Sequence, residues 1–344
     1  MLVINGSFLA QPPTGVQRFA IEISKELKRI SSNVEVVVPK NAILSRTTEA
    51  LSPKIIGRFT NHLWEQIDLY RYVRRKKALL LNLDMKGPLL YRNKIITIHD
   101  LNFLHNPRWV SPKFHCFYKF LTRVGAQTSR LVLTVSQFSK EEIQRHLHVP
   151  ASRVVVVYNA IANLDPVFHK DRYIADDYIL SVSSTHPRKN LDRLIQAFQQ
   201  LSDPTTKLVL VGLPHQGQSL SDISHKNVVF LGHIEDDILA NLYQHAVAFV
   251  YPSLYEGFGI PPLEAMYFGC PVVASNTSSI PEVCGEAVLY VDPNSTDSLL
   301  EGLREIMRNV ELRKKLIDRG HERLAHFSWA ASAKTIAEEI NHYL

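Results

Sequence analysis

The chain has 344 residues, of which 45% are hydrophobic and 21% are charged, and its formal net charge at pH 7 is +6. Because this length is about twice that of a typical domain, two domains are expected, and the composition excludes a disordered chain, a collagen and a disulfide-stapled miniprotein. No apolar run approaches the roughly 18 residues that a membrane-spanning helix needs. The first residues, MLVING, predict a strand and lack the features of a signal peptide.

Charge is distributed unevenly along the sequence. Residues 1–165 carry 24 Lys and Arg against 11 Asp and Glu, a formal charge of +13, whereas residues 166–344 carry 15 against 22, a formal charge of −7. We therefore expect the two halves to meet different partners. The three cysteines, Cys116, Cys270 and Cys284, lie far apart, which favours reduced thiols in a cytosolic protein.

Short β-branched runs alternate with amphipathic helical stretches throughout. In the first half, strands are predicted at 2–5, 34–38, 79–82, 94–99, 132–135 and 154–158, and helices at 16–29, 113–126 and 139–147. In the second half, strands are predicted at 178–182, 207–211, 228–231, 248–251, 272–275 and 288–291, and helices at 191–200, 237–246, 262–268 and 296–309. This alternation indicates parallel sheets covered on both faces, and hence two doubly wound, Rossmann-like α/β domains.

The least regular stretch, residues 160–177, contains Pro166 and is the predicted hinge. The sequence thus predicts a first domain at 1–165 and a second at 166–327, and the last helix, 328–344, is a candidate to pack back on the first. Ligands of open α/β sheets bind outside the carboxyl ends of the strands. Two such domains facing each other would share a cleft there, which is the expected active site.

The most informative segment runs from Tyr255 to Pro271 and reads YEGFGIPPLEAMYFGCP. Two glycines permit close backbone approach before a helix that has proline at its start, and the free N–H groups of such a helix start can bind phosphate. Glu256 precedes the turn, and Glu264 is expected in the first helical turn. Two interpretations stay open from the residues alone. The carboxylates bind sugar or ribose hydroxyls, or Glu264 complements the helix dipole while Glu256 caps the turn.

This segment resembles the Glu-x7-Glu motif of the retaining GT-B glycosyltransferases of family four, the "glycosyl transferases group 1" sequences. Similar tracts occur elsewhere in the chain: a glycine loop at Gln11–Arg18, a His-Asp segment at Thr97–Leu101, Pro-Arg-Lys-Asn at Pro187–Asn190, and Leu231–Ile234. The family's Gly-Arg before the Arg-Lys turn is replaced by Ser183-Ser184, which leaves open which basic groups hold the diphosphate.

The resemblance implies roles for individual residues. Arg188 and Lys189 would clamp the donor diphosphate, although two adjacent basic residues could also be a solvated helix start capped by Asn190. Glu256 would position hydroxyls of the donor sugar, and His99 would lie near the reacting centre. Catalytic candidates are therefore Glu256, His99, Lys189 and Arg188. Donor-binding candidates are Gly15, Gly257, Phe258, Gly259, Ile260, Glu264, His233 and Ile234, the last two by reading the nucleobase through backbone groups.

The implied reaction transfers a sugar from a nucleoside diphosphate to a hydroxyl with retention of configuration. The sequence contains no Asp-x-Asp pair for a Mg²⁺-bound sugar nucleotide, so no metal and no cofactor is expected. The nucleotide sugar is a substrate. The tract Leu63–Gln66, the His-Asp segment and the Pro-Arg-Lys-Asn turn resemble mannosyl- and rhamnosyltransferase-like members, which favours mannose or a deoxyhexose and a GDP-sugar.

The acceptor is expected on the basic first domain. Arg71–Lys77 follows a helical pattern with Leu63, Ile67 and Tyr70 on one face, which suits an anionic membrane surface or, alternatively, a solvated helix end. No nucleic-acid-binding module accompanies this charge. We therefore expect a cytoplasmic enzyme, peripheral at the inner face of the membrane, that acts on a lipid-linked saccharide or polysaccharide in cell-surface polysaccharide or lipopolysaccharide synthesis. The alternatives are a sugar-nucleotide epimerase or hydrolase and a non-catalytic sugar-nucleotide-binding protein.

Overall fold

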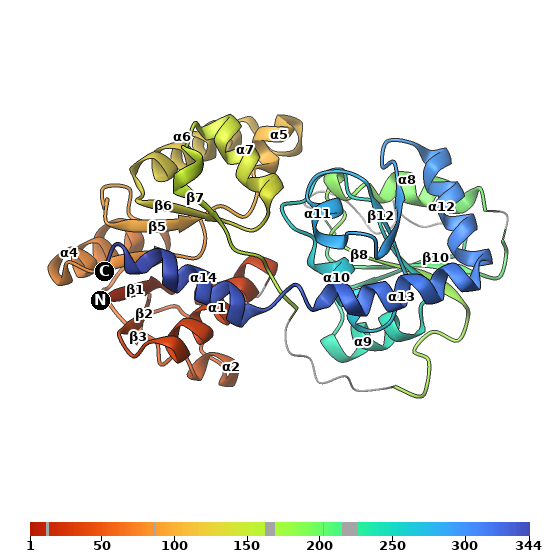
Figure 1. Cartoon of the computed structure of the whole chain (residues 1–344), viewed down its shortest axis with the longest axis horizontal. Helices are drawn as coiled ribbons and strands as arrows, with labels where there is room; N and C mark the ends of the chain where they lie inside the picture. The colour runs from red at the N-terminus through yellow and green to blue at the C-terminus, as the bar shows by residue number, and fades with distance from the viewer. Residues whose placement is uncertain (12–13, 86, 162–168, 202, 215–225) are drawn as a thin grey trace. The chain divides into compact units, whose positions relative to one another are not determined.

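The computed structural model describes residues 1–11, 14–85, 87–161, 169–201, 203–214 and 226–344. The chain divides into two compact units (Figure 1). Unit 1 comprises Met1–Ala162 together with Phe327–Leu344, and unit 2 comprises Asn163–His326. Pro166, in the predicted hinge, lies outside the described residues.

Unit 1 is built on a seven-stranded parallel sheet in the order β3-β2-β1-β4-β5-β6-β7. Its strands are β1 (Leu2–Asn5), β2 (Val34–Val38), β3 (Lys54–Ile55), β4 (Leu79–Asn82), β5 (Lys94–Thr97), β6 (Leu131–Thr134) and β7 (Val154–Val156). Its helices are α1 (Gly15–Ile30), α2 (Arg46–Glu49), α3 (Asn61–Leu63), the π-helix Trp64–Leu69, α4 (Tyr70–Lys76), α5 (Asn102–His105), α6 (Pro112–Thr128), α7 (Gln137–Leu147) and α14 (Trp329–Asn341).

Unit 2 is built on a six-stranded parallel sheet in the order β10-β9-β8-β11-β12-β13. Its strands are β8 (Tyr178–Val182), β9 (Lys207–Val211), β10 (Val228–Gly232), β11 (Ala248–Tyr251), β12 (Val272–Ser275) and β13 (Val288–Val291). Its helices are α8 (Leu191–Gln199), α9 (Asp236–His245), α10 (Ile260–Tyr267), α11 (Ile280–Cys284), α12 (Thr296–Arg308) and α13 (Val310–Leu324). Helices α8 and α12 lie on one side of the sheet and α9 and α10 on the other (Figure 1).

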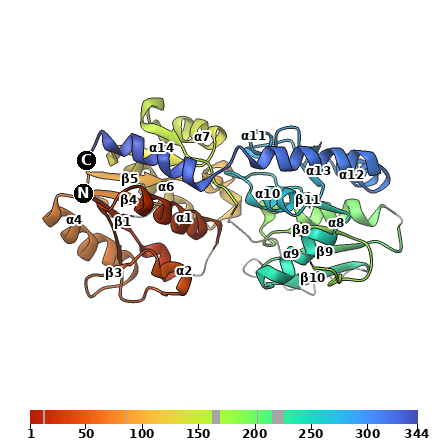
Figure 2. The ribbon, with the colours of Figure 1, turned by 60° about the horizontal axis from the view of Figure 1, so that its bottom comes forward.

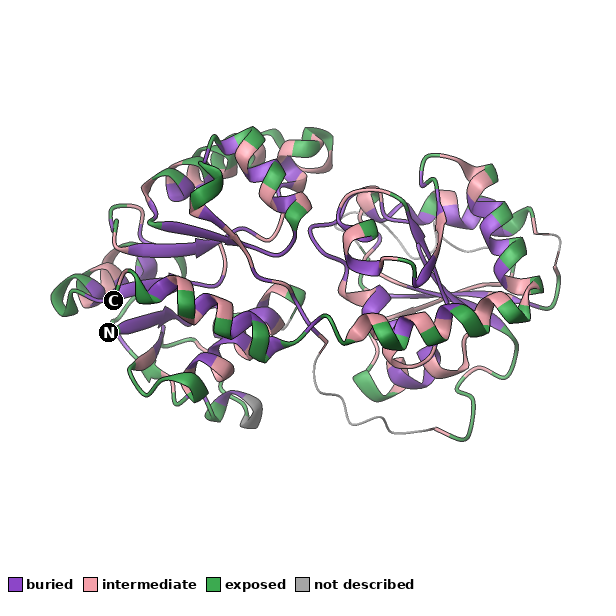
Figure 3. Ribbon diagram, viewed as in Figure 1, coloured by how far each residue is buried: buried purple, intermediate pink, exposed green. Residues whose placement is uncertain are grey.

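The predicted fold class, α/β with two doubly wound parallel sheets, is confirmed. Each predicted strand and helix is present, with ends that differ by a few residues. Strand β3 was missed, because Lys54 and Ile55 are both exposed and give no apolar run. Most of the remaining strands are largely buried, as the purple colour in Figure 3 shows, whereas the edge strands β7 and β10 are mostly half-buried. Near-continuous apolar strands of this kind are typical of parallel sheets covered on both faces.

The last helix completes unit 1. Helices α14 and α1 lie side by side (Figures 1 and 2), and the ring of Trp329 meets that of Phe19 edge-on at 5.9 Å. The hydroxyl of Ser332 donates to the backbone carbonyl of Tyr158 at 2.7 Å. The last helix of the chain therefore packs against the first helix and covers one of its faces.

The segment before the basic cluster is helical but is not one regular α-helix, and Ile67 and Tyr70 line the same hollow, as expected of residues on one face. A π-helix, Trp64–Leu69, interrupts it. Trp64 and Leu69 are both fully buried in the same cluster. Residues five apart do not share a face of an α-helix, but the i to i+5 bonding of a π-helix brings them together. The need to bury both side chains accounts for the wider turn.

Two further features bear on the predictions. Cys116, Cys270 and Cys284 are free thiols, as expected. Within the described part of the chain, no helix is long and apolar enough to cross a membrane.

Candidate active site

The glycine turn of unit 2 joins β11 to α10. Gly259 immediately precedes the helix with φ 108°, a left-handed conformation that favours glycine. A Cβ atom there would lie 2.8 Å from Cδ1 of Ile280, so the end of that side chain would have to shift to admit any other residue. The hydroxyl of Ser279 donates to the carbonyls of Glu256 and Phe258 at 2.9 and 2.8 Å. The turn Gly257–Ile260 is thus held in place before any ligand arrives.

Glu256 is buried between two cations. Nη1 of Arg188 lies 2.6 Å from its Oε2, and Nζ of Lys189 lies 2.6 Å from its Oε1. Burial by itself raises the pKa of Glu256, but the charges of Arg188 and Lys189 outweigh it and lower the pKa to about 2. The three side chains form an ionised cluster with a net charge of +1, which we call the Glu256 cluster.

The two cations reach the cluster from a 3-10 turn, Pro187–Lys189, that follows β8. Nη1 of Arg188 also donates to the carbonyl of Tyr255 at 3.1 Å, and Nζ of Lys189 donates to the hydroxyl of Tyr251 at 2.9 Å. Lys189 is only 9% exposed to solvent. The alternative of a solvated helix start is therefore wrong, because these basic groups point inward.

Asn190 does not cap α8 with its side chain, contrary to the prediction. It has φ 60°, and its amide donates to the carbonyls of Pro252 and Pro293 at 3.0 and 2.7 Å. Asn190 therefore ties the Arg-Lys turn to the segment after β11, and with it fixes the position of both cations.

Glu264 is found in the second turn of α10, not in the first, because the helix begins at Ile260 and not at Pro262. It accepts a hydrogen bond from the hydroxyl of Tyr243 at 3.3 Å. Burial raises the pKa of Tyr243 well above 10, and the Glu264 carboxylate adds to this effect, so the phenol stays a donor. The helix-dipole interpretation of Glu264 is weakened by its distance from the helix start.

His233 and Ile234 lie in unit 2 between β10 and α9, where His233 is exposed and Ile234 is half-buried. The preceding Gly232 has φ 70°. Neither residue has a hydrogen bond to the Glu256 cluster among the contacts of the described residues. Their backbone groups remain candidates for binding a nucleobase.

His99 and Gly15 belong to unit 1. Gly15 is the first residue of α1, after Thr14 and its capping partner Gln17. His99 follows β5, packs edge-on against Phe19 at 5.0 Å, and has Nε2 3.0 Å from the carbonyl oxygen of Leu83. Burial lowers the pKa of His99, so the neutral ring donates through Nε2 and keeps Nδ1 as an acceptor.

The structure therefore brings Arg188, Lys189, Glu256 and the glycine turn together within unit 2. Sequence reasoning missed Tyr251 and Ser279, which support this cluster. Tyr251 stands at the carboxyl end of β11, a position that could have marked it. Among the described residues, no group of three or more His, Cys, Asp or Glu side chains could hold a metal ion.

Comparison with protein families gives two matches. Residues 169–323 match the model described as "Glycosyl transferases group 1", and residues 13–162 match "Glycosyltransferase Family 4". Together these matches extend over most of both units.

Curated relatives and solved structures agree with them. The O-antigen chain mannosyltransferase B of Escherichia coli is 31% identical over 92% of this chain and 93% of its own length, and the O-antigen chain mannosyltransferase RfbU of Salmonella typhimurium is 27% identical over 95% and 96%. Anabaena Alr3699/HepE in complex with UDP superposes with a TM-score of 0.78 at 19% identity, covering 99% of each chain. The lipopolysaccharide glycosyltransferase WaaG gives 0.73 at 16% identity over 99% of each.

Proposed function

Because the chain belongs to the group 1 glycosyl transferases and is a GT-B glycosyltransferase, we propose that it transfers mannose from GDP-mannose to a hydroxyl of a lipid-linked saccharide. Transfer retains the anomeric configuration and serves the synthesis of a cell-surface polysaccharide. The names of the two O-antigen mannosyltransferases that resemble this chain support the choice of sugar.

The Glu256 cluster is the observation that carries this proposal. A nucleoside diphosphate gains negative charge as the sugar departs, and fixed positive groups stabilise that charge without reorganisation. Arg188 and Lys189 supply two such groups, and the amides of Gly257, Phe258, Gly259 and Ile260 add the positive end of α10. Glu256 holds the cations in position and offers the carboxylate that binds sugar hydroxyls. Glu264 binds the ribose.

The remaining candidates act around this centre. The backbone of His233 and Ile234 binds the guanine base. From unit 1, Gly15 admits the donor close to the backbone, and neutral His99 presents Nδ1 as a hydrogen-bond acceptor for a hydroxyl.

A thermal-shift screen tests the donor. GDP-mannose and GDP are expected to raise Tm more than UDP-glucose or dTDP-rhamnose at equal concentration, since a ligand that binds only the folded state stabilises it. Transfer is then measured as mannose incorporated into a lipid-linked saccharide. A larger shift with UDP-glucose would replace the proposed donor. Release of GDP without transferred mannose would favour a hydrolase, and binding without any turnover would favour a non-catalytic protein.

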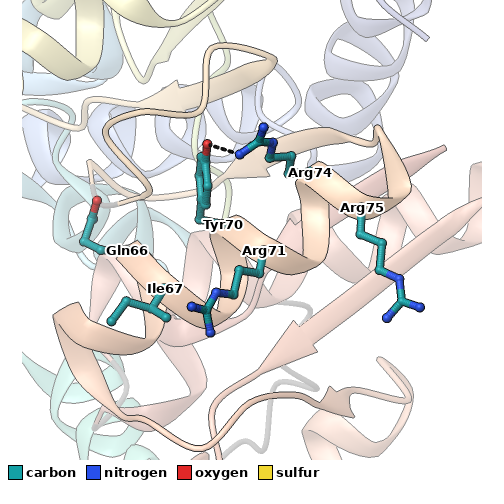
Figure 4. A pocket seen from close by; sticks show the side chains of 6 residues that line it. All are labelled: Gln66, Ile67, Tyr70, Arg71, Arg74 and Arg75. Atoms are coloured by element: carbon teal, nitrogen blue, oxygen red, sulfur yellow. Dashed lines mark hydrogen bonds between the residues drawn. The ribbon is translucent and has the colours of Figure 1, made fainter.

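A lipid-linked acceptor requires access to the bilayer, and we place the protein at the inner face of the membrane. Arg71, Arg74 and Arg75 project from α4 beside a surface hollow of about 550 Å³ (Figure 4). Arg74 interacts with Tyr70, and Lys76 pairs with Glu35 at 2.8 Å, so part of the basic cluster is engaged within the protein. Helix α6 additionally exposes three phenylalanines next to basic residues: Phe114, Phe117, Phe120, Lys113, Lys119 and Arg123. Such a surface suits an anionic bilayer.

Co-sedimentation with vesicles tests this location. Binding to phosphatidylglycerol vesicles is expected to exceed binding to phosphatidylcholine vesicles and to weaken with salt. Replacing Arg71 and Arg75 together by Glu should reduce it by roughly 30-fold or more, since each basic residue contributes about 1 kcal/mol. The charge-matched control replaces by Glu the residues Arg29 and Lys40, which are exposed and lie outside α4 and α6. Equal loss in both double variants would show that only net charge matters.

A further inference from the structure

Unit 1 contains a polar hollow that has no part in the roles assigned so far. It has a volume of about 270 Å³, and its polar lining consists of Ser7, Gln11, Asn61, His62 and Glu65. A second hollow of only about 40 Å³ shares His62 and Glu65 with it and has Met85, Tyr118 and Leu121 on its apolar side. We call the pair the Glu65 hollow.

The hollow lies at a particular place in the sheet. From β1 the chain builds outward to β2 and β3 on one side and then to β4 on the other, so the strand order reverses between β1 and β4. Ligands of open α/β sheets bind at such a point, beyond the carboxyl ends of the strands. Ser7 follows β1, Pro39 follows β2 and Met85 follows β4, and all three line the hollow.

Hydrogen bonds connect this point of the sheet to Glu65. Asn82 at the end of β4 accepts from the amide of Asn5 at the end of β1, at 3.0 Å. Asn5 in turn accepts from the backbone N–H of Ser7 at 3.1 Å. The hydroxyl of Ser7 donates to Oε1 of Glu65 at 3.3 Å. The carboxylate is therefore positioned by both strands that flank the reversal.

The π-helix delivers Glu65 to this position. Trp64 is anchored by its indole N–H, which donates to the carbonyl of Ile56 at 2.8 Å. Gln66 donates to the carbonyl of Gly87 and accepts from the N–H of Leu89, both at 2.9 Å. Glu65, between these two anchored residues, is 2% exposed yet lines both hollows. π-Helical turns occur frequently at functional sites.

The chemistry of the lining selects the ligand. A carboxylate only accepts hydrogen bonds, so it favours a ligand rich in hydroxyls and disfavours a phosphate. Asn61 and Gln11 can both donate and accept, as sugar hydroxyls require. Ala10 and Pro39 offer an apolar surface for the C–H face of a sugar ring. The volume of about 270 Å³ is near the lower end of small-ligand sites, which suits one or two sugar rings.

We propose that the Glu65 hollow binds the terminal sugar of the acceptor saccharide, and that Glu65 positions the acceptor by accepting hydrogen bonds from its hydroxyls. This proposal rests on the glycosyltransferase function proposed above and names the acceptor site. Glu65 is a positioning residue for the acceptor, and it leaves donor binding to unit 2.

Kinetics of the full chain with GDP-mannose and methyl α-mannoside as acceptor test the site. In the Glu65→Gln variant, the KM for methyl α-mannoside should rise by roughly 10- to 100-fold, the effect of losing a hydrogen bond to a charged group. The KM for GDP-mannose should stay unchanged. The control is Glu142→Gln, which alters a buried carboxylate of α7 outside the hollow and should leave both constants unchanged.

A second variant tests the hollow even if Glu65→Gln fails to fold. Asn61 has φ 52°, so Asn61→Gly removes the amide while keeping a backbone that glycine tolerates. It should raise the KM for methyl α-mannoside by several-fold with an unchanged Tm. The proposal is overturned if both hollow variants keep the wild-type acceptor KM, or if Glu65→Gln raises the KM for GDP-mannose equally.

Saturation-transfer NMR separates this inference from the proposed function. Methyl α-mannoside, methyl β-galactoside and methyl β-N-acetylglucosaminide are added singly to wild-type protein and to both hollow variants. Saccharide binding that the variants lose supports the site even if no sugar is transferred, whereas binding that they retain overturns it. If none of the three binds while transfer occurs from GDP-mannose to a larger acceptor, the KM comparison is repeated with that acceptor and decides the matter.

Discussion

Both units bury a charged side chain, but they stabilise it in different ways. In unit 2, Glu256 lies between Arg188 and Lys189, whose charges lower its pKa to about 2 against the opposing effect of burial. In unit 1, Lys94 on β5 is 1% exposed and donates to the carbonyls of Pro88 and Leu89 at 2.7 and 3.2 Å. Burial lowers the pKa of Lys94 to about 8.

The contrast shows what each charge is suited to do. Opposite charges keep the Glu256 cluster ionised over the whole ordinary pH range, which suits the binding of an anionic diphosphate. Backbone carbonyls replace only part of the hydration that an ammonium group loses, so Lys94 is ionised at a cost. Its contacts instead fix the loop that carries Leu89, which lines the Glu65 hollow.

The largest effect is expected from Glu256→Gln. The change leaves Arg188 and Lys189 buried without their counter-charge, and we expect the free energy of unfolding to fall by about 3–5 kcal/mol, measured by urea denaturation. Turnover should fall much more than nucleotide affinity. Because a diphosphate supplies the missing negative charge, GDP should raise the Tm of the variant more than that of the wild type. A loss below about 1 kcal/mol would show that the buried Glu256 cluster stabilises the protein no more than an exposed ion pair does.

The second prediction concerns acid. The pKa of Glu256 is lowered in the folded state from an ordinary value of 4.5 to about 2. Its ion pairs therefore stabilise the protein fully above pH 4.5, and this contribution is lost as the pH falls toward 2. The difference in unfolding free energy between the wild type and Glu256→Gln should be constant from pH 7 to 5 and shrink below that. A constant difference down to pH 3 would contradict the assigned pKa.

Lys94 should show the opposite pH dependence, over an alkaline range. Its pKa is lowered from 10.5 to about 8, so the buried ammonium costs stability below pH 8, and that cost is relieved as the pH rises to 10.5. Compared with a Lys94→Met variant, the wild type should gain unfolding free energy between pH 8 and 10. Parallel pH profiles of the two proteins, recorded by thermal denaturation, would show that Lys94 is not desolvated.

The smallest effect is expected at Asn190, an uncharged residue that supports the Glu256 cluster. Asn190→Gly keeps the left-handed backbone but removes the amide that donates to Pro252 and Pro293. We expect a loss of about 1–3 kcal/mol, because the buried carbonyl of Pro252 loses a donor, whereas the carbonyl of Pro293 keeps Arg193. Asn190→Ala should be less stable than Asn190→Gly, since alanine is strained at φ 60°. Equal stability of the two variants would show that the backbone relaxes.

Much of the fold could be predicted because its signals are local. The β-branched runs of β1 or β9 and the glycine turn before α10 are readable within a few residues. The ion pairs of Glu256 are different, since Arg188 and Glu256 are 68 residues apart and meet only because β8 and β11 are neighbours in the sheet. Their motifs could be recognised in the sequence, but their contact could not.

The errors have the same origin. The prediction that Asn190 caps α8 used a local preference that two distant carbonyls override. The π-helix departs from the local helical period because Trp64 and Leu69 are drawn into one core. The Glu65 hollow went unnoticed because its lining comes from several strand ends and from α6, which no single stretch of sequence displays together.

The return of α14 to unit 1 has a consequence for synthesis on the ribosome. Until α14 has been synthesised, Phe19 of α1 lacks its aromatic neighbour Trp329, and the carbonyl of Tyr158 lacks the hydroxyl of Ser332. The ribosome must translate all of unit 2 before these partners emerge. Unit 2, whose residues are contiguous, can finish folding while unit 1 still exposes an uncovered helix face. The unit that is translated first is thus completed last, and a chain released before α14 would carry that apolar face into the cell.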